Sequence, residues 1–317
     1  MKVSILVPVY GAEQYIADCC RSLFGQTYED IEYIFVNDCT KDRSMEVIKE
    51  TLAEYPERRQ QVSIVSNERN MGVGAARQRC INEAGGDYLM FVDADDTITD
   101  NAVELLLKAV TGAGADIATA AHAETCKGDI MRVYHTKHYD RVSLMRGLLL
   151  QNTVAHQLTA RIYRRAFITA SGIRFAEGID NAEDYCFTSR IFLHAKYVTI
   201  DDVVYYHRTD TCGVYTTFSR KNVTSLLKAN AVVCRFFTDN DKERKYYSAL
   251  HIGMLKPLIV AMKNGFGYDE AVEICGYGTD IPPAVSLCHL LLRRFGAVRT
   301  VNILYLMIKR IYRTLRT

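Results

Sequence analysis

Segments typical of β-strands and α-helices alternate over residues 3–93, and this alternation constrains the fold more than any other feature of the sequence. Four short runs are rich in β-branched and aromatic residues, at 3–10, 31–37, 62–66 and 88–92. Helix-like stretches separate them. This pattern predicts an α/β protein with a mostly parallel, doubly wound sheet and right-handed crossovers. Ligands of such sheets bind beyond the carboxyl ends of the strands.

The ends of the first three strands carry candidate binding residues. The first strand ends at residues 8–10, and Asp38 follows the second. The segment 70–79, NMGVGAARQR, follows the third and enters a helix, so its backbone N–H groups are expected to face an anion with help from Arg77. A plain structural turn is the alternative. The segment is neither G-x-G-x-x-G nor a Walker loop, which argues against a dinucleotide or P-loop site.

The fourth strand ends in three carboxylates among four residues, within the segment 87–96 (DYLMFVDADD). Asp93, Asp95 and Asp96 repel one another, so the arrangement is unfavourable unless a cation or hydrogen-bond donors offset the charge. We therefore expect a hard divalent metal that carries a polyphosphate. The alternative is a solvated turn that caps the helix expected from Asn101, since Asp is common in loops and at N-caps.

A second acidic place lies in the segment 178–190, GIDNAEDYCFTSR. Glu183 and Asp184 follow a loop and directly precede a helical pattern. A carboxylate at this position can simply cap the N-terminus of the helix, and the residues alone favour that interpretation.

Three segments resemble the donor half of the family 2 glycosyltransferases, which have the GT-A fold: VSILVPVYGAEQYI, YIFVNDCTKDRS and NMGVGAARQRCINEAGGDYLMFVDADD. The resemblance runs through Asp96, with its motifs in order and at suitable spacing. It implies that Asp38 contacts the base of a nucleotide, usually uracil. It also implies that the nucleotide is lined by Pro8, Val9 and Tyr10.

The same resemblance implies the rest of a donor site. In the family, the residues that match Asn70 and Arg77 lie against the nucleotide, and the residue that matches Asp95 lies by the ribose. Asp93 is expected in the same site. Asp96 is expected to hold Mn²⁺ or Mg²⁺, with Asp95 beside it.

Two further places gain a role from the resemblance. Family 2 enzymes carry a Glu-Asp pair where this chain has Glu183 and Asp184, and the aspartate is the general base for the acceptor hydroxyl. Their Tyr-Tyr-x-Arg segment matches YYHR at residues 205–208. It implies that Arg208 pairs with a phosphate and that His207 is a further metal ligand. A packed or surface histidine is the alternative for His207.

The chain is expected to divide near residue 218. Residues 1–218 would form the GT-A domain, with a nucleotide-sugar half at about 1–97 and an acceptor half at about 98–218. Residues 219–317 have a helical pattern and would form a C-terminal helical region.

The C-terminal tail differs in charge from the rest of the chain. No acidic residue follows Asp280, whereas seven Lys and Arg residues do, which leaves a net charge of −5 for the rest of the chain. The last helix places Val301, Leu304 and Tyr305 on an apolar face with Lys309 opposite. Such a helix can lie on an anionic membrane surface or pack against protein, and both interpretations stay open.

The cysteines and the hydropathy indicate where in the cell the protein is found. Ten cysteines are scattered without a C-x-x-C pair, which argues against a zinc site and indicates a reducing environment. The N-terminus does not resemble a secretory signal, and no run of about twenty apolar residues predicts a spanning helix. We expect a cytoplasmic protein that contacts the inner face of the cell membrane peripherally and has no nucleic-acid partner.

Together these features predict an inverting, metal-dependent glycosyltransferase. It would move a sugar from a nucleotide-sugar, expected to be a UDP-sugar, to a hydroxyl of a glycan or lipid-linked glycan in cell-surface polysaccharide synthesis. The chain contains no Trp and so lacks the Gln-x-x-Arg-Trp motif of long processive members, which favours a single addition. One alternative is a catalytically decayed, nucleotide-sugar-binding scaffold of a membrane assembly. Another is a nucleotidyltransferase. Such enzymes usually have a Gly-rich basic loop near the N-terminus, and residues 8–16 (PVYGAEQYI) contain no Lys or Arg.

Overall fold

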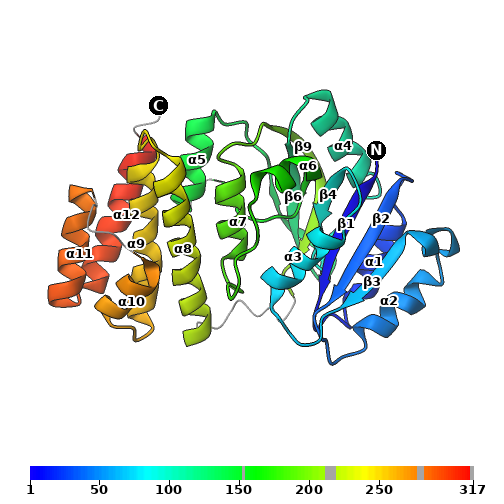
Figure 1. Ribbon diagram of the computed structural model, residues 1–317, viewed down its shortest axis with the longest axis horizontal. Helices are drawn as coiled ribbons and strands as arrows, with labels where there is room; N and C mark the ends of the chain where they lie inside the picture. The colour runs from blue at the N-terminus through cyan, green and yellow to red at the C-terminus, as the bar shows by residue number, and fades with distance from the viewer. Residues whose placement is uncertain (152–153, 211–218, 277–281, 315–317) are drawn as a thin grey trace. The chain divides into compact units, whose positions relative to one another are not determined.

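The computed structural model describes residues 1–151, 154–210, 219–276 and 282–314, which belong to two compact units (Figure 1). The first unit consists of Met1–His138, Gln157–Glu177 and His194–Gly213. The second consists of Tyr139–His156, Gly178–Leu193 and Val214–Thr317. This division differs from the one expected near residue 218, because two stretches of the expected acceptor half are grouped with the C-terminal helices.

Four parallel strands form the N-terminal part of the sheet in the first unit. They are β1 (Val3–Val9), β2 (Ile31–Asn37), β3 (Val62–Ser66) and β4 (Tyr88–Phe91), in the order β3-β2-β1-β4. The segments between them form α1 (Ile16–Phe24), α2 (Ser44–Leu52), the 3-10 helix η1 (Pro56–Gln61) and α3 (Val73–Glu83). Nearly every side chain of β1 and β4 is buried, as expected for parallel strands covered by crossover helices.

Five further strands extend this sheet with mixed directions. They are β5 (Thr97–Ile98), β6 (Ile117–Cys126), β7 (Asp129–Tyr134), β8 (Arg161–Arg164) and β9 (Tyr197–Arg208). β8 pairs antiparallel with β4 and β6, β9 runs parallel to β6, and β5 and β7 are antiparallel to β9 and β6. The helices α4 (Ala102–Gly112) and α6 (Arg165–Ser171) complete the unit. The predicted α/β class is confirmed.

The pairing of β5 with β9 decides which residues meet beyond β4. Thr97 lies opposite Tyr206, and Ile98 lies opposite Tyr205. Because β5 begins directly after the acidic turn, this register places residues 93–96 beside the end of β9.

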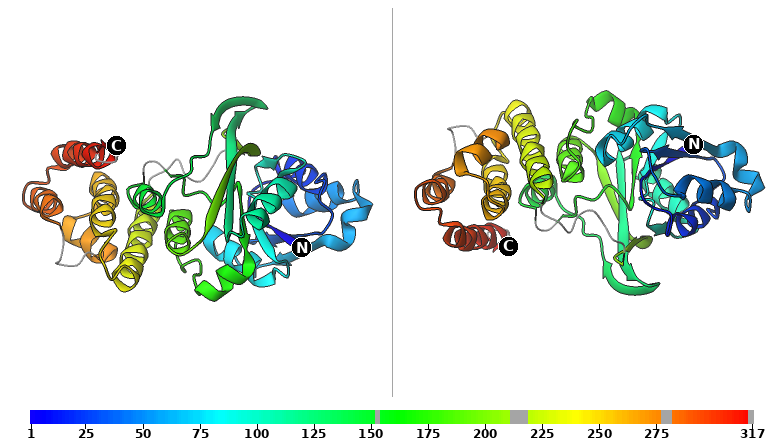
Figure 2. Two further views of the ribbon diagram at one scale, coloured as in Figure 1. Left: turned by 90° about the horizontal axis from the view of Figure 1, so that it is seen from above. Right: turned by 90° about the horizontal axis from the view of Figure 1, so that it is seen from below.

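The second unit is helical (Figure 2). Its helices are α5 (Arg141–Leu149), α7 (Glu183–Ile191), α8 (Arg220–Asn240), α9 (Tyr247–Lys263), α10 (Tyr268–Cys275), α11 (Pro283–Phe295) and α12 (Val298–Thr314). A close approach joins α9 to the end of α5: a Cβ added to Gly253 would stand 2.0 Å from the carbonyl oxygen of Leu149. Among the described helices, none has the length and apolar character needed to cross a membrane.

The last helix packs against α9 and α11. Val301 and Tyr305 are buried, and Leu304 is half-buried, so the apolar face expected from the sequence is turned mainly toward protein. Lys309 is half-buried as well, and its Nζ donates to the backbone oxygen of Gln151 at 3.3 Å. The side chains from residue 311 onward lie outside the described ones.

Candidate functional site

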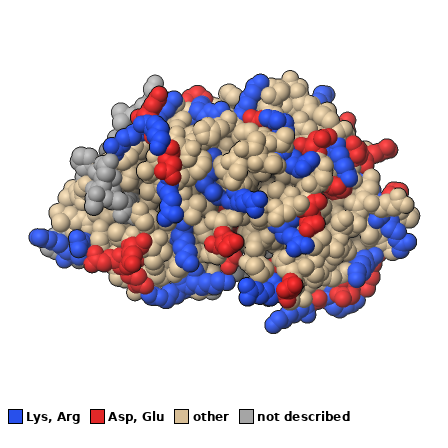
Figure 3. Space-filling model, viewed as in Figure 1, with Lys and Arg blue, Asp and Glu red and all other residues tan. Residues whose placement is uncertain are grey.

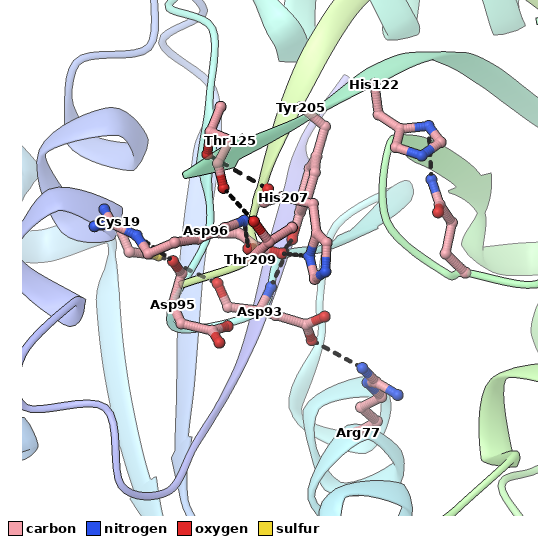
Figure 4. Close-up of polar contacts among 12 residues, drawn as sticks. Cys19, Arg77, Asp93, Asp95, Asp96, His122, Thr125, Tyr205, His207 and Thr209 are labelled. Carbon is pink, nitrogen blue, oxygen red and sulfur yellow. Dashed lines mark hydrogen bonds and ion pairs between the residues drawn. The ribbon is translucent and has the colours of Figure 1, made fainter. Parts of the chain in front are cut away.

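Asp96 is the most enclosed carboxylate of the acidic turn (Figure 4). Its Oδ2 accepts hydrogen bonds from the hydroxyl of Tyr205 at 2.6 Å and from Nδ1 of His207 at 3.1 Å. Its Oδ1 accepts one from the backbone N–H of Arg208 at 2.8 Å. All three donors lie at the end of β9, so the β5–β9 register explains why Asp96 can be buried as an anion.

His207 is half-exposed and bonded to Asp96. That hydrogen bond raises the pKa of His207 to about 9, so the imidazole is positively charged at neutral pH. Burial raises the pKa of Asp96, and the bond to His207 opposes this shift. The structure therefore places His207 beside a predicted metal-binding acid, as one of its hydrogen-bond donors.

The other two acids of the turn are more open and less well compensated. Asp93 Oδ1 accepts from Nη2 of Arg77 at 2.8 Å, and this arginine is 3% exposed. Burial and the charges of Asp96 and Asp93 raise the pKa of Asp95 to about 6. Negative charge thus gathers around Asp95, at an edge where the guanidinium groups of Arg77 and Arg208 also lie.

Arg208 is the second cation at this edge. Its Nε donates to the backbone oxygen of Asp95 at 3.2 Å, and its Nη2 lies 3.0 Å from Oδ2 of Asp18 in α1. The guanidinium also lies over the ring of Tyr15, 5.2 Å from its centroid. The charged end of Arg208 is therefore oriented by contacts from two segments of the first unit, the acidic turn and the start of α1.

Asp38 binds the loop that precedes α3. Its Oδ1 accepts from Nδ2 of Asn67 and from the backbone N–H of Met71, and its Oδ2 accepts from the N–H of Gly72, each at 2.8 Å. The expectation that these N–H groups face a bound anion is therefore wrong for Met71 and Gly72. A buried carboxylate needs donors, and the backbone of this loop supplies them.

The remaining predicted donor residues lie at the same sheet edge with different exposure. Val9 is fully buried, and its carbonyl oxygen accepts from the N–H of Asp38 at 3.0 Å, so its side chain faces the core. Pro8 is half-buried, whereas Tyr10 and Asn70 are exposed. The structure thus brings together the ends of β1, β2 and β4, the start of α3 and the end of β9.

The described residues contain no group of three His, Cys, Asp or Glu side chains that is arranged to hold a metal. The donor types nevertheless suit a hard divalent cation, because Asp95 and Asp96 offer oxygens, and His207 offers an imidazole nitrogen once it has lost its proton. Burial is the main cause of the raised pKa of Asp95, and the charges of Asp96 and Asp93, which a cation would offset, add to it. Metal binding there stays a prediction.

Glu183 and Asp184 belong to the second unit and start α7. Glu183 is buried and Asp184 is half-buried. The loop before them is tied to α8, because the hydroxyl oxygen of Ser225 accepts from the N–H groups of Asp180 and Asn181, both at 2.9 Å. The approach of Asp184 to an acceptor stays a prediction.

Three residues of the site were not expected from the sequence: Tyr205, Asp18 and Tyr15. Tyr205 has a recognisable signal, because it stands two residues before His207 and therefore points to the same face of β9. Asp18 and Tyr15 have none, since their contact with Arg208 spans about 190 residues of chain.

The sequence is similar to those of known proteins. EpsH of Bacillus subtilis (strain 168) is 27% identical over 275 residues, which cover 83% of this chain and 76% of EpsH. The poly(ribitol-phosphate) β-N-acetylglucosaminyltransferase TarS of Staphylococcus aureus (strain Mu50) is 24% identical over 216 residues, which cover 67% of this chain but only 36% of TarS.

The fold has solved counterparts too. The crystal structure of S. aureus TarS 1–349 in complex with UDP-GlcNAc superimposes with a TM-score of 0.71 at 20% identity, covering 99% of this chain and 92% of that one. This likeness confirms the GT-A architecture. The family model "Glycosyl transferase family 2" matches residues 4–172, more than half of the sequence, and includes the whole acidic turn. The chain therefore belongs to the family 2 glycosyltransferases.

Proposed function

We propose that this glycosyltransferase takes its sugar from a UDP-sugar and transfers it, with inversion, to a hydroxyl of a glycan or lipid-linked glycan. The observation that carries the proposal is the edge at which Asp93, Asp95 and Asp96 meet Arg77 and Arg208 within a family 2 domain. The complexes of TarS with UDP and UDP-GlcNAc support the donor class.

Each residue of this edge has a role in donor binding. Arg208 and Arg77 supply the positive charge that a diphosphate requires, and arginine can bind phosphate oxygens in pairs. Asp95 binds the ribose. Asp38 fixes the loop of residues 67–72, so that the loop and the exposed Asn70 and Tyr10 form the nucleotide lining.

Asp95, Asp96 and His207 would hold Mn²⁺ or Mg²⁺, which supplies Lewis-acid stabilisation of a leaving diphosphate. The protein contributes to the same end through Arg208, whose backbone N–H and side chain are both fixed at the acidic turn. Tyr205 holds Asp96 in position through its hydroxyl.

Asp184 acts as the general base. Its carboxylate takes the proton from the acceptor hydroxyl while that oxygen attacks the anomeric carbon from the face opposite the diphosphate. The bond to the diphosphate breaks in the same displacement, so the configuration inverts. Glu183, buried beside it at the start of α7, positions Asp184. A glycosidase would instead need a second carboxyl to protonate its leaving group.

The acceptor belongs to cell-surface polysaccharide synthesis, and the reaction takes place in the cytoplasm, at the inner face of the membrane. The activity named for TarS, on poly(ribitol-phosphate), supports an extended surface polymer as the acceptor class. The basic C-terminal tail supports a membrane-bound acceptor, because Lys and Arg side chains are attracted to anionic lipid surfaces.

Calorimetric titration with UDP, GDP and CDP, each with and without Mn²⁺, tests the donor. We expect UDP to bind most tightly and more tightly with Mn²⁺. A folded protein that binds none of the three would refute the proposal. Release of UDP from UDP-sugars in the presence of candidate acceptors then separates an enzyme from a decayed scaffold, which would bind UDP without turnover.

A further inference from the structure

The last helix has a second apolar stripe that the protein leaves exposed. Ile303, Leu306 and Met307 are 58%, 53% and 55% exposed, although α12 already buries Val301 and Tyr305 on its other side. Residues at i, i+3, i+4 and i+7 share one face of a helix. Arg299 and Arg310, both exposed, bound this face at its two ends. We call these five residues the α12 stripe.

The helix that carries the stripe and the two helices it packs against are cationic. α9, α11 and α12 contain no Asp or Glu, and the helices that α12 packs against are α9 and α11. Over the face drawn in Figure 3, acidic and basic side chains are interspersed. Of the three acids in neighbouring α10, Asp269 pairs with Arg293 and Glu270 with Arg220, and Glu273 is exposed. Lys256 and Lys309 add to the positive charge, and the pKa of Lys309 is lowered by burial and by Lys256.

We propose that the α12 stripe is a membrane-binding surface that inserts Ile303, Leu306 and Met307 among the headgroups of an anionic bilayer, with Arg299 and Arg310 against the lipid phosphates. Exposed apolar side chains between arginines match both parts of an anionic bilayer: the apolar side chains suit its interior, and the arginines suit its negative headgroups. The purpose of this surface, to hold the enzyme near a lipid-linked acceptor, rests on the proposed function.

A second copy of the chain is the competing occupant. In a two-fold contact through one helix face, the same patch meets itself, so Arg299 and Arg310 would approach their own counterparts. No acidic side chain of α9, α11 or α12 is present to offset that repulsion. Charge complementarity therefore favours the anionic bilayer.

The test is cosedimentation of the full chain with extruded vesicles, of phosphatidylglycerol mixed with phosphatidylcholine or of phosphatidylcholine alone. We expect binding to the anionic vesicles only, weakening as salt is added. The double variant Ile303→Ser, Leu306→Ser should lose at least about ten-fold in partition. Arg299→Gln and Arg310→Gln should each lose about five-fold.

The matched control lies in β7, where Ile130 and Met131 are 58% and 65% exposed. Ile130→Ser, Met131→Ser removes comparable apolar surface and should leave vesicle binding unchanged. The proposal fails if the wild type ignores anionic vesicles, if the stripe variants bind like the wild type, or if the control loses as much. It also fails if sedimentation velocity shows a dimer that only the stripe variants dissociate.

UDP titration of the same samples keeps the two proposals apart. The stripe variants should bind UDP like the wild type, because the stripe and the donor edge lie in different units. Vesicle binding without UDP binding would remove the donor assignment and leave the membrane surface. UDP binding without vesicle binding would do the reverse.

Discussion

Nη2 of Arg208 and Oδ2 of Asp18 lie 3.0 Å apart, an ion pair that joins the end of β9 to the first turn of α1. The side chain of Asp18 is 55% exposed and that of Arg208 is 22% exposed, so the pair is open to solvent and to ligands. Arg208 is held independently through its Nε and its backbone N–H. If Arg208 binds the donor diphosphate as proposed, Asp18 competes with that diphosphate for a cation that is already in place.

Asp18→Asn should accordingly tighten UDP binding. Exposed ion pairs contribute up to about 1 kcal/mol, so we expect the Kd to fall by up to about five-fold at low salt and the difference to shrink at high salt. Arg208→Gln, measured beside it, should raise the Kd. Weaker binding by the Asp18 variant would mean that this carboxylate orients Arg208 instead of competing for it.

Asp184→Asn should separate chemistry from donor binding. Loss of a general base costs about 10²- to 10⁴-fold in kcat, while UDP affinity should stay within error because Asp184 lies outside the donor unit. Asp96→Asn provides the contrast, because an amide cannot accept from all the donors that surround that carboxylate. This variant should weaken metal-dependent UDP binding. Steady-state kinetics and calorimetry on both variants give the answer, and an unchanged kcat in Asp184→Asn would remove the base assignment.

Asp38→Asn should destabilise the first unit. The NH2 of the new amide cannot accept the hydrogen bonds that the loop of residues 67–72 donates to Asp38. A buried donor left without a partner lowers the free energy of unfolding by about 1–3 kcal/mol. Asp42→Asn is the matched comparison, because Asp42 accepts from the hydroxyls of Thr40 and Ser44 at the start of α2 but is much less buried. We expect a cost nearer 1 kcal/mol there, typical of a lost hydrogen bond at a less buried position. Thermal melts monitored by circular dichroism should rank the two in this order.

His122 should give the protein a pH-dependent stability on the acid side. Burial, with the charges of Arg161 and His207, lowers the pKa of His122 to about 4 in the folded state. The unfolded chain takes up this proton near pH 6.5, so the contribution is complete above about pH 6.5 and is lost as the pH falls toward 4.

Replacement by Gln should reduce the slope of stability against pH between these limits. Denaturant titrations at several pH values measure the effect as a difference from the wild type. That difference matters because burial lowers the pKa of His289 to about 4 as well, and His289 contributes in the same direction. Identical slopes in variant and wild type would show that His122 gains its proton equally in both states.

Gly253→Ala should disrupt the second unit. The added methyl group would stand 2.0 Å from the carbonyl oxygen of Leu149, so α9 and α5 would have to separate, at a cost of several kcal/mol. Gly112→Ala is the control: this helical glycine has nothing within 4 Å of an added Cβ and should gain up to about 1 kcal/mol. Melting temperatures should therefore move in opposite directions. A tolerated Gly253→Ala would mean that the two helices are not packed this closely.

The sequence was most informative where structure is local. The strands 31–37 and 62–66 match the expected bounds, because each is a short apolar run between clear breaks. The acidic turn at the end of β4 was predictable for the same reason. Its partners were less so: Tyr205 reaches Asp96 through a strand pairing across more than a hundred residues, and no local pattern encodes that register.

The C-terminal helix shows the limit of periodicity in another way. The pattern correctly located the apolar side that contains Val301 and Tyr305, which is buried. It did not reveal that Ile303, Leu306 and Met307 form another stripe, because a helix apolar on two sides weakens its own periodic signal. The grouping of residues 139–156 and 178–193 with the C-terminal helices was equally hidden, since it depends on contacts distant in sequence.

The three hydrogen bonds of Asp38 carry a thermodynamic consequence for the nucleotide. A glycine-containing loop that closed only around its ligand would lose conformational freedom at every binding event, and affinity would fall by that amount. Here the carboxylate fixes the loop during folding, before any nucleotide arrives. The nucleotide lining proposed above is thus preorganised, and its entropy cost appears in the stability of the protein and not in the affinity for the donor.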